Sequence, residues 1–222
     1  MHIRRTHGRP RTTAEALAIQ ERLRPLVDTG ARGPAEPRRI AGLDVAYDKH
    51  SDRLAAAVVV LDAATLAVRE ELVVIGRVAF GYVPGLFAFR ELPALIEALE
   101  RLRCEPDVLV CDGHGIAHPR RFGLACHLGV LTDLPAIGVA KTLLTGTYEE
   151  PGQERGAWRP LCDEGEIIGR ILRTRTGVKP VFVSVGHKVN LDDACRYVLD
   201  LCPKYRLPET TRRADQLSRR CL

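Results

Sequence analysis

The stretch Ile40-Ala41-Gly42-Leu43-Asp44-Val45-Ala46 decides the fold, together with its counterpart Asp107-Val108-Leu109-Val110-Cys111-Asp112-Gly113. Both are strand-like apolar runs that carry an acid near one end, and an ionised carboxylate is costly to bury alone. If the two strands lie side by side in one sheet, Asp44 and Asp112 crowd and repel each other. A divalent cation between them would relieve that repulsion. The pattern therefore predicts a Mg²⁺-type site, and such sites usually act on phosphates.

The chain has the size and composition of one folded α/β domain. Its 222 residues are 45% hydrophobic, enough for a proper core, and neither an internal repeat nor a long linker divides them. We expect a single domain over 1–222, in which 1–38 form an N-terminal helix and a connector. The formal net charge of +5 is carried mostly by Arg, which pairs well with phosphate and favours a polyanionic partner.

Cysteine usage and hydropathy bear on where the protein works. Its seven Cys form no CxxC pair, and the basic, polar start of the chain lacks the apolar segment of a signal peptide. No apolar run approaches the roughly 20 residues that span a bilayer. We expect a reduced, cytoplasmic protein with no membrane partner.

Hydrophobic periodicity and turn residues predict the order of the elements. A helix over 12–28 and a Gly/Pro/Arg-rich connector precede three strands, which short polar links join into an antiparallel meander. The expected strands are 39–47, 54–61 and 71–79. An amphipathic helix over 86–103 follows, although Pro93 suits a first turn better than a helix interior.

The second half of the chain alternates helices and strands. The expected elements are a strand at 107–111, a helix at 119–131 with Pro119 near its first position, a strand at 135–140, a loop-rich region at 145–165, a hairpin of 166–173 and 179–185, and helices at 191–202 and 209–220. Three meandering strands followed by helix, strand, helix and strand is the order of a ribonuclease H-like α/β fold, a mixed sheet flanked by helices. In that topology the first and fourth strands are neighbours, as the two acids require.

The segment Gly81-Tyr82-Val83-Pro84-Gly85 lies between a strand and a helix. Two Gly and one Pro fix a turn that would hold Tyr82 on a stiff loop. An exposed aromatic ring on such a loop can wedge between stacked bases. The alternative is a structural turn whose Tyr packs inward, and the residues alone slightly favour it.

A more specific pattern runs from Asp112 to Arg121. Gly113 and Gly115 let the backbone approach a ligand beyond the acid-bearing strand, and a helix N-terminus with Arg120 and Arg121 would bind an anion. His118, near that helix start, is a candidate cap or phosphate contact. Cys111, His114 and Cys126 leave a zinc protein as an alternative, although their spacing matches no common finger.

Four further residues are site candidates by position. Lys141 closes a strand and could contact a phosphate, while His187 ends another strand and suits a phosphate-binding turn. Glu91 enters the helix at 86–103, and Asp215 lies in the last helix. Either acid is an ordinary surface or capping charge unless the fold brings it to Asp44 and Asp112.

Together these segments resemble the endonuclease V family, the deoxyinosine 3′ endonucleases, over about 40–217. The matching stretches are Gly42-Leu43-Asp44, Tyr82-Val83-Pro84-Gly85, Phe89-Arg90-Glu91, Asp112-Gly113-His114-Gly115, His118-Pro119-Arg120-Arg121, Gly138-Val139-Ala140-Lys141, Gly186-His187 and Tyr205-Arg206-Leu207-Pro208-Glu209. The resemblance implies that Asp44, Glu91 and Asp112 form the acidic, metal-binding site.

The same resemblance assigns roles to the remaining candidates. It implies that Lys141 is the basic companion of the acids and that Asp215 is a fourth acidic member. The wedge would be formed by Tyr82, Pro84 and Gly85, and part of the base pocket by Leu86, Gly113 and Gly115.

The implied activity is Mg²⁺-dependent cleavage, with Mn²⁺ able to substitute, of the second phosphodiester bond 3′ to deoxyinosine. The products would carry 3′-hydroxyl and 5′-phosphate ends, and the partner is DNA containing hypoxanthine, cut by a monomer. Inosine-containing RNA is the alternative substrate. A ribonuclease H, a junction resolvase, or a non-catalytic nucleic-acid binder on the same scaffold are alternative functions.

Overall fold

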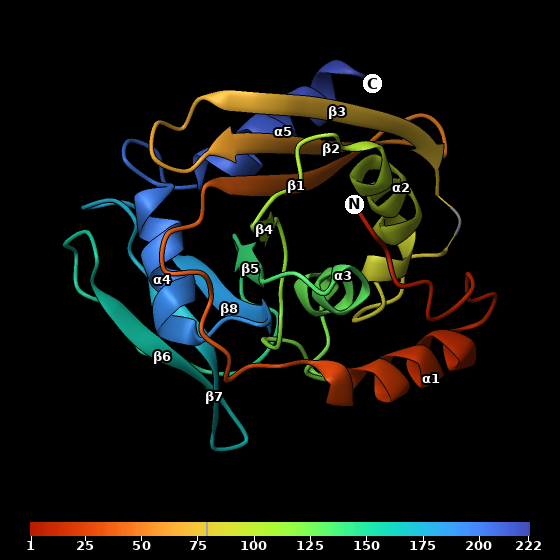
Figure 1. Cartoon of the computed structure of the whole chain (residues 1–222). Helices are drawn as coiled ribbons and strands as arrows, with labels where there is room; N and C mark the ends of the chain where they lie inside the picture. The colour runs from red at the N-terminus through yellow and green to blue at the C-terminus, as the bar shows by residue number, and fades with distance from the viewer. Residues whose placement is uncertain (79) are drawn as a thin grey trace.

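Eight strands in one sheet, with helices on both faces, form the architecture of the protein (Figure 1). The structure is a computed structural model that describes every residue except position 79. The strand order is β3-β2-β1-β4-β5-β8-β7-β6. The strands are β1 (Arg39–Tyr47), β2 (Arg53–Asp62), β3 (Val68–Arg77), β4 (Val108–Cys111), β5 (Ala136–Ala140), β6 (Trp158–Asp163), β7 (Glu166–Leu172) and β8 (Val181–His187). The helices are α1 (Thr13–Leu23), α2 (Ala88–Arg101), α3 (Leu124–Thr132), α4 (Leu191–Asp200) and α5 (Glu209–Arg220), and a short 3-10 turn η1 (Arg24–Leu26) follows α1.

The centre of the sheet has the predicted topology. Strand β1 pairs antiparallel with β2 and parallel with β4, and β4 pairs parallel with β5. The meander of β1, β2 and β3 and the hairpin of β7 and β8 are also as predicted. The mixed α/β fold with neighbouring first and fourth strands is therefore confirmed.

Burial on both faces explains why β2 is an almost continuous apolar run. Leu54, Ala56 and Val58 pack into the core beneath α2 and α3, whereas Ala57 and Val59 pack against α5. Helices α4 and α5 cover one face of the sheet, and α2 and α3 cover the other, with α1 on the outer side of α3 (Figure 1). A strand enclosed in this way has no solvent face and needs no alternating pattern.

The helix predicted from 119 begins five residues later, at Leu124. Arg121 has a left-handed φ of 54°, and Gly123 is extended, so the chain is not helical at either position. The segment between β4 and α3 instead packs backbone to backbone, with the Gly123 N–H donating to the Gly115 carbonyl at 3.0 Å. Pro119 is thus part of a loop, and the predicted helix start was wrong.

The remaining differences from expectation concern β6, Pro93 in α2 and the end of β3. The region predicted as loop-rich contains β6, which forms because it pairs antiparallel with β7. Pro93 lies inside α2, in its second turn, where the absent N–H removes one helical hydrogen bond. The third strand ends at Arg77, and position 79 of its predicted range lies outside the described residues.

Among the described residues, no helix combines the length and apolar character needed to cross a bilayer.

At Gly42 of β1, the backbone of α5 leaves no room for a side chain. A Cβ atom there would lie 2.1 Å from the backbone carbon of Thr210, a separation that real contacts do not allow. We expect Gly42→Ala to push α5 off the sheet and to lower the free energy of unfolding by about 1–3 kcal/mol, as overpacking does. Chemical denaturation would measure this, with Gly8→Ala as the control because a Cβ there meets nothing within 4 Å. Equal stability of the two variants would contradict the close packing.

Candidate active site

The pairing of β1 with β4 brings Asp44 and Asp112 together. Leu43 is in register with Cys111, and the N–H of Asp112 donates to the Leu43 carbonyl at 3.1 Å. The two acids that follow this pair stand on adjacent parallel strands. Burial and the negative charge of Asp112 raise the pKa of Asp44 to about 7, against a hydrogen bond from Ser218 that lowers it.

Glu91 joins the two aspartates from the first turn of α2. Its side chain is buried, and the Tyr47 hydroxyl donates to its Oε1 atom at 3.1 Å. Burial, followed by the charges of Asp44 and Asp112, raises the pKa of Glu91 well above its usual value. Glu91 is therefore electrostatically part of the same acidic cluster and is not a surface charge.

Lys141 follows β5 and forms an ion pair with Asp112. Burial lowers the pKa of Lys141, but its hydrogen bond to Asp112 and the charge of Asp44 outweigh that effect and leave the pKa raised. The ammonium group is therefore cationic at neutral pH and directly beside the carboxylates. The structure brings Lys141 to the acids, as the sequence predicts.

Helix α5 contributes Asp215 and a residue that sequence reasoning missed, Ser218. The charge of Asp215 contributes to raising the pKa of Asp44, although its carboxylate also pairs with Arg219 at 3.0 Å. The Oγ atom of Ser218 lies 2.9 Å from Oδ2 of Asp44 and 3.0 Å from the backbone carbonyl of Asp215. Ser218 is one helical turn after Asp215, and this spacing is the signal that could have identified it.

The donor set suits a hard divalent cation. Asp44, Asp112 and Glu91 offer carboxylate oxygens, which Mg²⁺ and Mn²⁺ prefer, and a cation would offset both the burial and the neighbouring charge of Asp112 that raise the pKa of Asp44. Among residues 1–78 and 80–222, no three His, Cys, Asp or Glu side chains gather closely enough to hold a metal by themselves. The geometry thus fits a cation held by one or two carboxylates with water completing its shell.

The zinc alternative finds no support in the cysteines. Cys111 and Cys126 are both buried, and burial raises the pKa of each thiol, that of Cys126 to about 12. Among residues 1–78 and 80–222 they belong to no group of three His, Cys, Asp or Glu side chains that could hold a metal ion.

A pocket of about 370 Å³ opens beside the acidic cluster. Seven of the predicted catalytic and substrate-binding residues line it, namely Tyr82, Pro84, Gly85, Asp112, Gly113, His118 and Lys141, and so does His114 of the zinc alternative. The Tyr82 side chain is 70% exposed at the rim, so the alternative in which its ring packs inward is wrong. The pocket has the concave, mixed lining of a small-molecule site.

Much of the pocket wall was not predicted. The additional lining residues include Gln20, Phe87, Phe122, Leu124, Thr142, Leu143 and Leu144. Phe87, Phe122 and Thr142 each adjoin a stretch that the sequence singled out. Gln20 comes from α1, Leu124 from the start of α3, and Leu143 and Leu144 from the loop after β5, and no local pattern signals that these segments converge.

Three predicted substrate contacts are not at the pocket surface. Leu86 is buried beneath it, with 1% of its surface exposed, and Gly115 packs against the backbone of β8, where a Cβ would lie 2.0 Å from the Val185 carbonyl oxygen. His187 lies in register with Ala136, at the start of β5, whereas Lys141 follows the other end of that strand. The structure therefore does not bring His187 to the acids.

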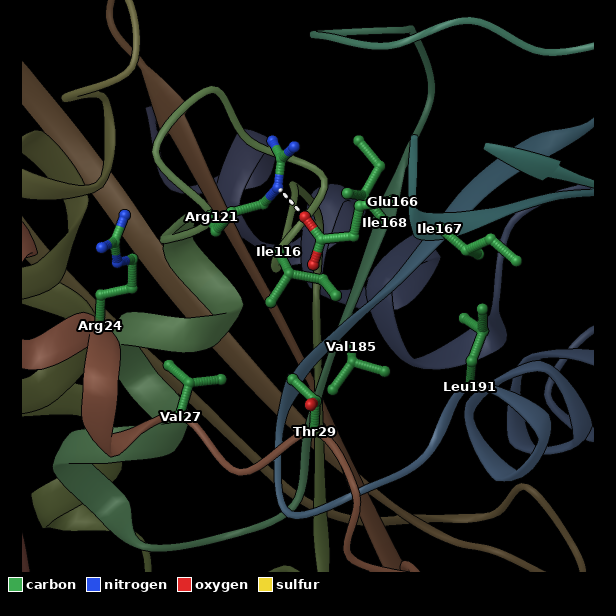
Figure 2. A pocket seen from close by; sticks show the side chains of 10 residues that line it. All are labelled: Arg24, Val27, Thr29, Ile116, Arg121, Glu166, Ile167, Ile168, Val185 and Leu191. Atoms are coloured by element: carbon green, nitrogen blue, oxygen red, sulfur yellow. Dashed lines mark hydrogen bonds and ion pairs between the residues drawn. The ribbon is translucent and has the colours of Figure 1, made fainter. Parts of the chain in front are cut away.

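Arg120 and Arg121 do not form the predicted anion site at a helix N-terminus. Arg120 donates to Gln20 and to the Gly85 carbonyl, and Arg121 pairs with Asp163 and Glu166. Figure 2 shows the contact between Arg121 and Glu166 of β7, two of the residues that line a second pocket of about 320 Å³. Both guanidinium groups are used to hold this loop in place.

Comparisons with known proteins agree on one family. The Endonuclease V family model matches residues 21–216. Endonuclease V of Streptomyces avermitilis is 57% identical over 221 residues, covering 99% of this chain and 96% of that protein. Its crystal structure superposes with a TM-score of 0.93 at 56% identity, covering 100% of this chain and 97% of the other.

A more distant relative was solved with nucleic acid. Endonuclease V of Ciona intestinalis, in complex with a 24-mer DNA containing an inosine followed by a ribo-adenosine, superposes with a TM-score of 0.80 at 29% identity. The match covers 93% of this chain and 96% of the other. With the acidic cluster, the pocket and these full-length matches, the chain belongs to the endonuclease V family.

Proposed function

We propose that this protein cleaves DNA at the second phosphodiester bond 3′ to deoxyinosine, leaving 3′-hydroxyl and 5′-phosphate ends. One observation carries the proposal: an acidic cluster with a lysine stands at the mouth of a base-sized pocket whose rim presents an exposed Tyr82. Family membership and the inosine-containing DNA bound to the Ciona relative support the same substrate.

Asp44 and Asp112 would hold Mg²⁺ or Mn²⁺, and Glu91 would bind a water of its shell. When bound, the cation supplies positive charge to the scissile phosphate and lowers the pKa of a coordinated water. Ser218 holds the Asp44 carboxylate through one oxygen and leaves the other available to the cation. Asp215 adds negative charge from α5 and so contributes to the raised pKa of Asp44.

The remaining residues bind and orient the substrate. Lys141 places a permanent positive charge beside Asp112, where it would contact the phosphate and stabilise its developing charge. Tyr82 would fill the gap left by a flipped base, and the backbone around Gly113 would read the edge of hypoxanthine in the pocket. His187 is left out of this contact set because it stands at the far end of β5.

We further propose that the protein acts as a monomer in the cytoplasm. One chain supplies every group of the site, and all seven cysteines are free thiols, as in a reducing compartment. The ribo-adenosine after the inosine in the Ciona complex makes inosine-containing RNA the second candidate substrate.

The decisive test is cleavage of an oligonucleotide with a single deoxyinosine. We expect a cut at the second phosphodiester 3′ to the lesion in Mg²⁺, none in EDTA, and none in a strand with deoxyadenosine at that position. Asp44→Asn and Asp112→Asn should each slow cleavage at least about 100-fold, because the amide keeps the shape of the side chain and loses its charge. Mapping the products by gel and their end groups by phosphatase treatment would measure this.

Asp200→Asn is the matched control, because Asp200 is exposed on α4. Wild-type rates in either active-site variant would refute the metal assignment. Faster cleavage of the same lesion in RNA would make the protein a ribonuclease.

The pKa of Asp44 predicts how metal binding depends on pH. A carboxyl whose pKa is raised to about 7 holds its proton more tightly in the folded than in the unfolded protein, so without metal its contribution to stability declines as pH rises from about 4 through 7. A divalent cation binds only the deprotonated form. We therefore expect Mg²⁺, compared with EDTA, to raise the melting temperature more at pH 8 than at pH 5.5.

Thermal unfolding at both pH values would check this, and Asp44→Asn should remove the difference while Asp200→Asn keeps it. The same gain at pH 5.5 and pH 8 would show that Mg²⁺ binds away from Asp44.

The exposed ring of Tyr82 predicts a substrate-dependent defect. Tyr82→Ala should reduce kcat/KM for deoxyinosine in duplex DNA by about tenfold more than in single strands, because a wedge matters most where bases must be unpaired. Single-turnover cleavage of matched duplex and single-stranded substrates would measure the two losses. Equal losses on both would make Tyr82 a general contact and not a wedge.

A further inference from the structure

A buried glutamine in α1 forms its side-chain hydrogen bonds with segments that line the pocket and not with residues of its own helix. Gln20 is 1% exposed, although α1 lies on the outside of the molecule. Its Nε2 atom donates to the carbonyls of Gly85 at 3.0 Å and Phe122 at 3.1 Å, and its Oε1 atom accepts from Nε of Arg120 at 2.6 Å. Each of these bonds ends on a segment that lines the pocket.

The Gly85 carbonyl is where these contacts converge. Besides Gln20, Nη2 of Arg120 donates to it at 2.6 Å, and Nε2 of His118 lies 2.9 Å away. The N–H of Arg120 donates to Nδ1 of His118, so Nε2 carries the proton and is a third donor. Three hydrogen-bond donors thus share the two lone pairs of the Gly85 carbonyl oxygen, and together they restrain its position from several directions.

This carbonyl closes the loop that carries the exposed tyrosine. Gly85 has a left-handed φ of 75°, three residues after Tyr82, and a Cβ there would meet the Arg120 guanidinium at 2.4 Å. The Phe122 carbonyl, held by the same Gln20 amide, belongs to another segment of the pocket lining, the loop before α3. One side chain thus joins the end of the Tyr82 loop to a second segment of the pocket wall.

The packing of α1 does not require this arrangement. Its apolar stripe of Ala16, Ile19 and Leu23 already buries the helix against the core. An apolar residue at position 20 would extend that stripe without the cost of burying an amide. The amide is satisfied only because the pocket segments supply its partners.

We propose that Gln20 is a positioning residue for base recognition, which fixes the Tyr82 loop and the Phe122 wall through the Gly85 carbonyl. The inference rests on the proposed function and adds to it a role for α1, a helix that begins before the residues matched by the family model. Preorganising the loop removes the cost of ordering it when DNA binds, which matters most when a base pair must be opened.

The test compares Gln20→Met, which keeps the length of the side chain and removes its hydrogen bonds, with the control Glu21→Gln on the exposed face of α1. We expect Gln20→Met to reduce kcat/KM on deoxyinosine duplex by about tenfold more than on the single strand, as the loss of buried hydrogen bonds would. Glu21→Gln should match the wild type on both. Assays are run well below the melting temperature of each variant.

A double variant separates positioning from general damage. In the Tyr82→Ala background, Gln20→Met should change the duplex-to-single-strand ratio by less than about twofold, because both substitutions act on one loop. Gln20→Glu, whose carboxylate has no hydrogen to donate to either carbonyl, should behave like Gln20→Met. It serves as the second variant if the Gln20→Met protein folds poorly.

Equal losses on both substrates, or a full additional loss in the Tyr82→Ala background, would overturn the inference. A wild-type protein that leaves the deoxyinosine strand uncut would instead overturn the proposed function before any variant is compared.

Discussion

The repulsion between Asp44 and Asp112 is the constraint on which the rest of the site depends. Bringing two like charges together costs free energy, and burial together with the charge of Asp112 raises the pKa of Asp44 to about 7. The fold accepts this cost by surrounding the pair with compensating groups: the Lys141 ammonium on one side and the Ser218 hydroxyl on the other. Lys141 follows β5, which pairs with β4, and Ser218 lies on α5, which packs on β1. The pairing of these strands, the packing of α5 and the balance of charge around the two acids therefore depend on one another.

The sequence predicted this arrangement because its determinants are local. The apolar run of each strand and the position of its acid follow from adjacent residues, and the order of elements then requires β1 and β4 to pair. The register of the two strands then places the acids. Because Leu43 lies opposite Cys111, the residues that follow them, Asp44 and Asp112, are neighbours. Glu91 was assigned to the site only through the family resemblance, because a glutamate in the first turn of an amphipathic helix is by itself an ordinary capping charge.

What the sequence did not reveal depends on contacts between distant segments. The loop from Gly113 to Gly123 carries Pro119, a reliable sign of a helix start, yet it stays non-helical because the Gly115 N–H bonds Ser184 and the Ile116 N–H bonds Val185 on β8. Strand β6, with a proline and no alternation, forms because it pairs with β7 and, at Cys162, with Thr147. The Gln20 contacts span 65 to 102 residues of chain, a distance at which no spacing rule applies.

The position of α5 in the chain has a consequence for how the enzyme is made. The Ser218 hydroxyl bonds the Asp44 carboxylate across 174 residues, and α5 follows every strand of the sheet. During synthesis the meander, β4 and β5 emerge first, whereas the helix that completes the acidic cluster emerges after all of them. A chain still being synthesised therefore lacks the Ser218 hydroxyl that holds the Asp44 carboxylate. The hydrogen bond between the first strand and the last helix is a long-range contact that forms late, after the rest of the chain has been made.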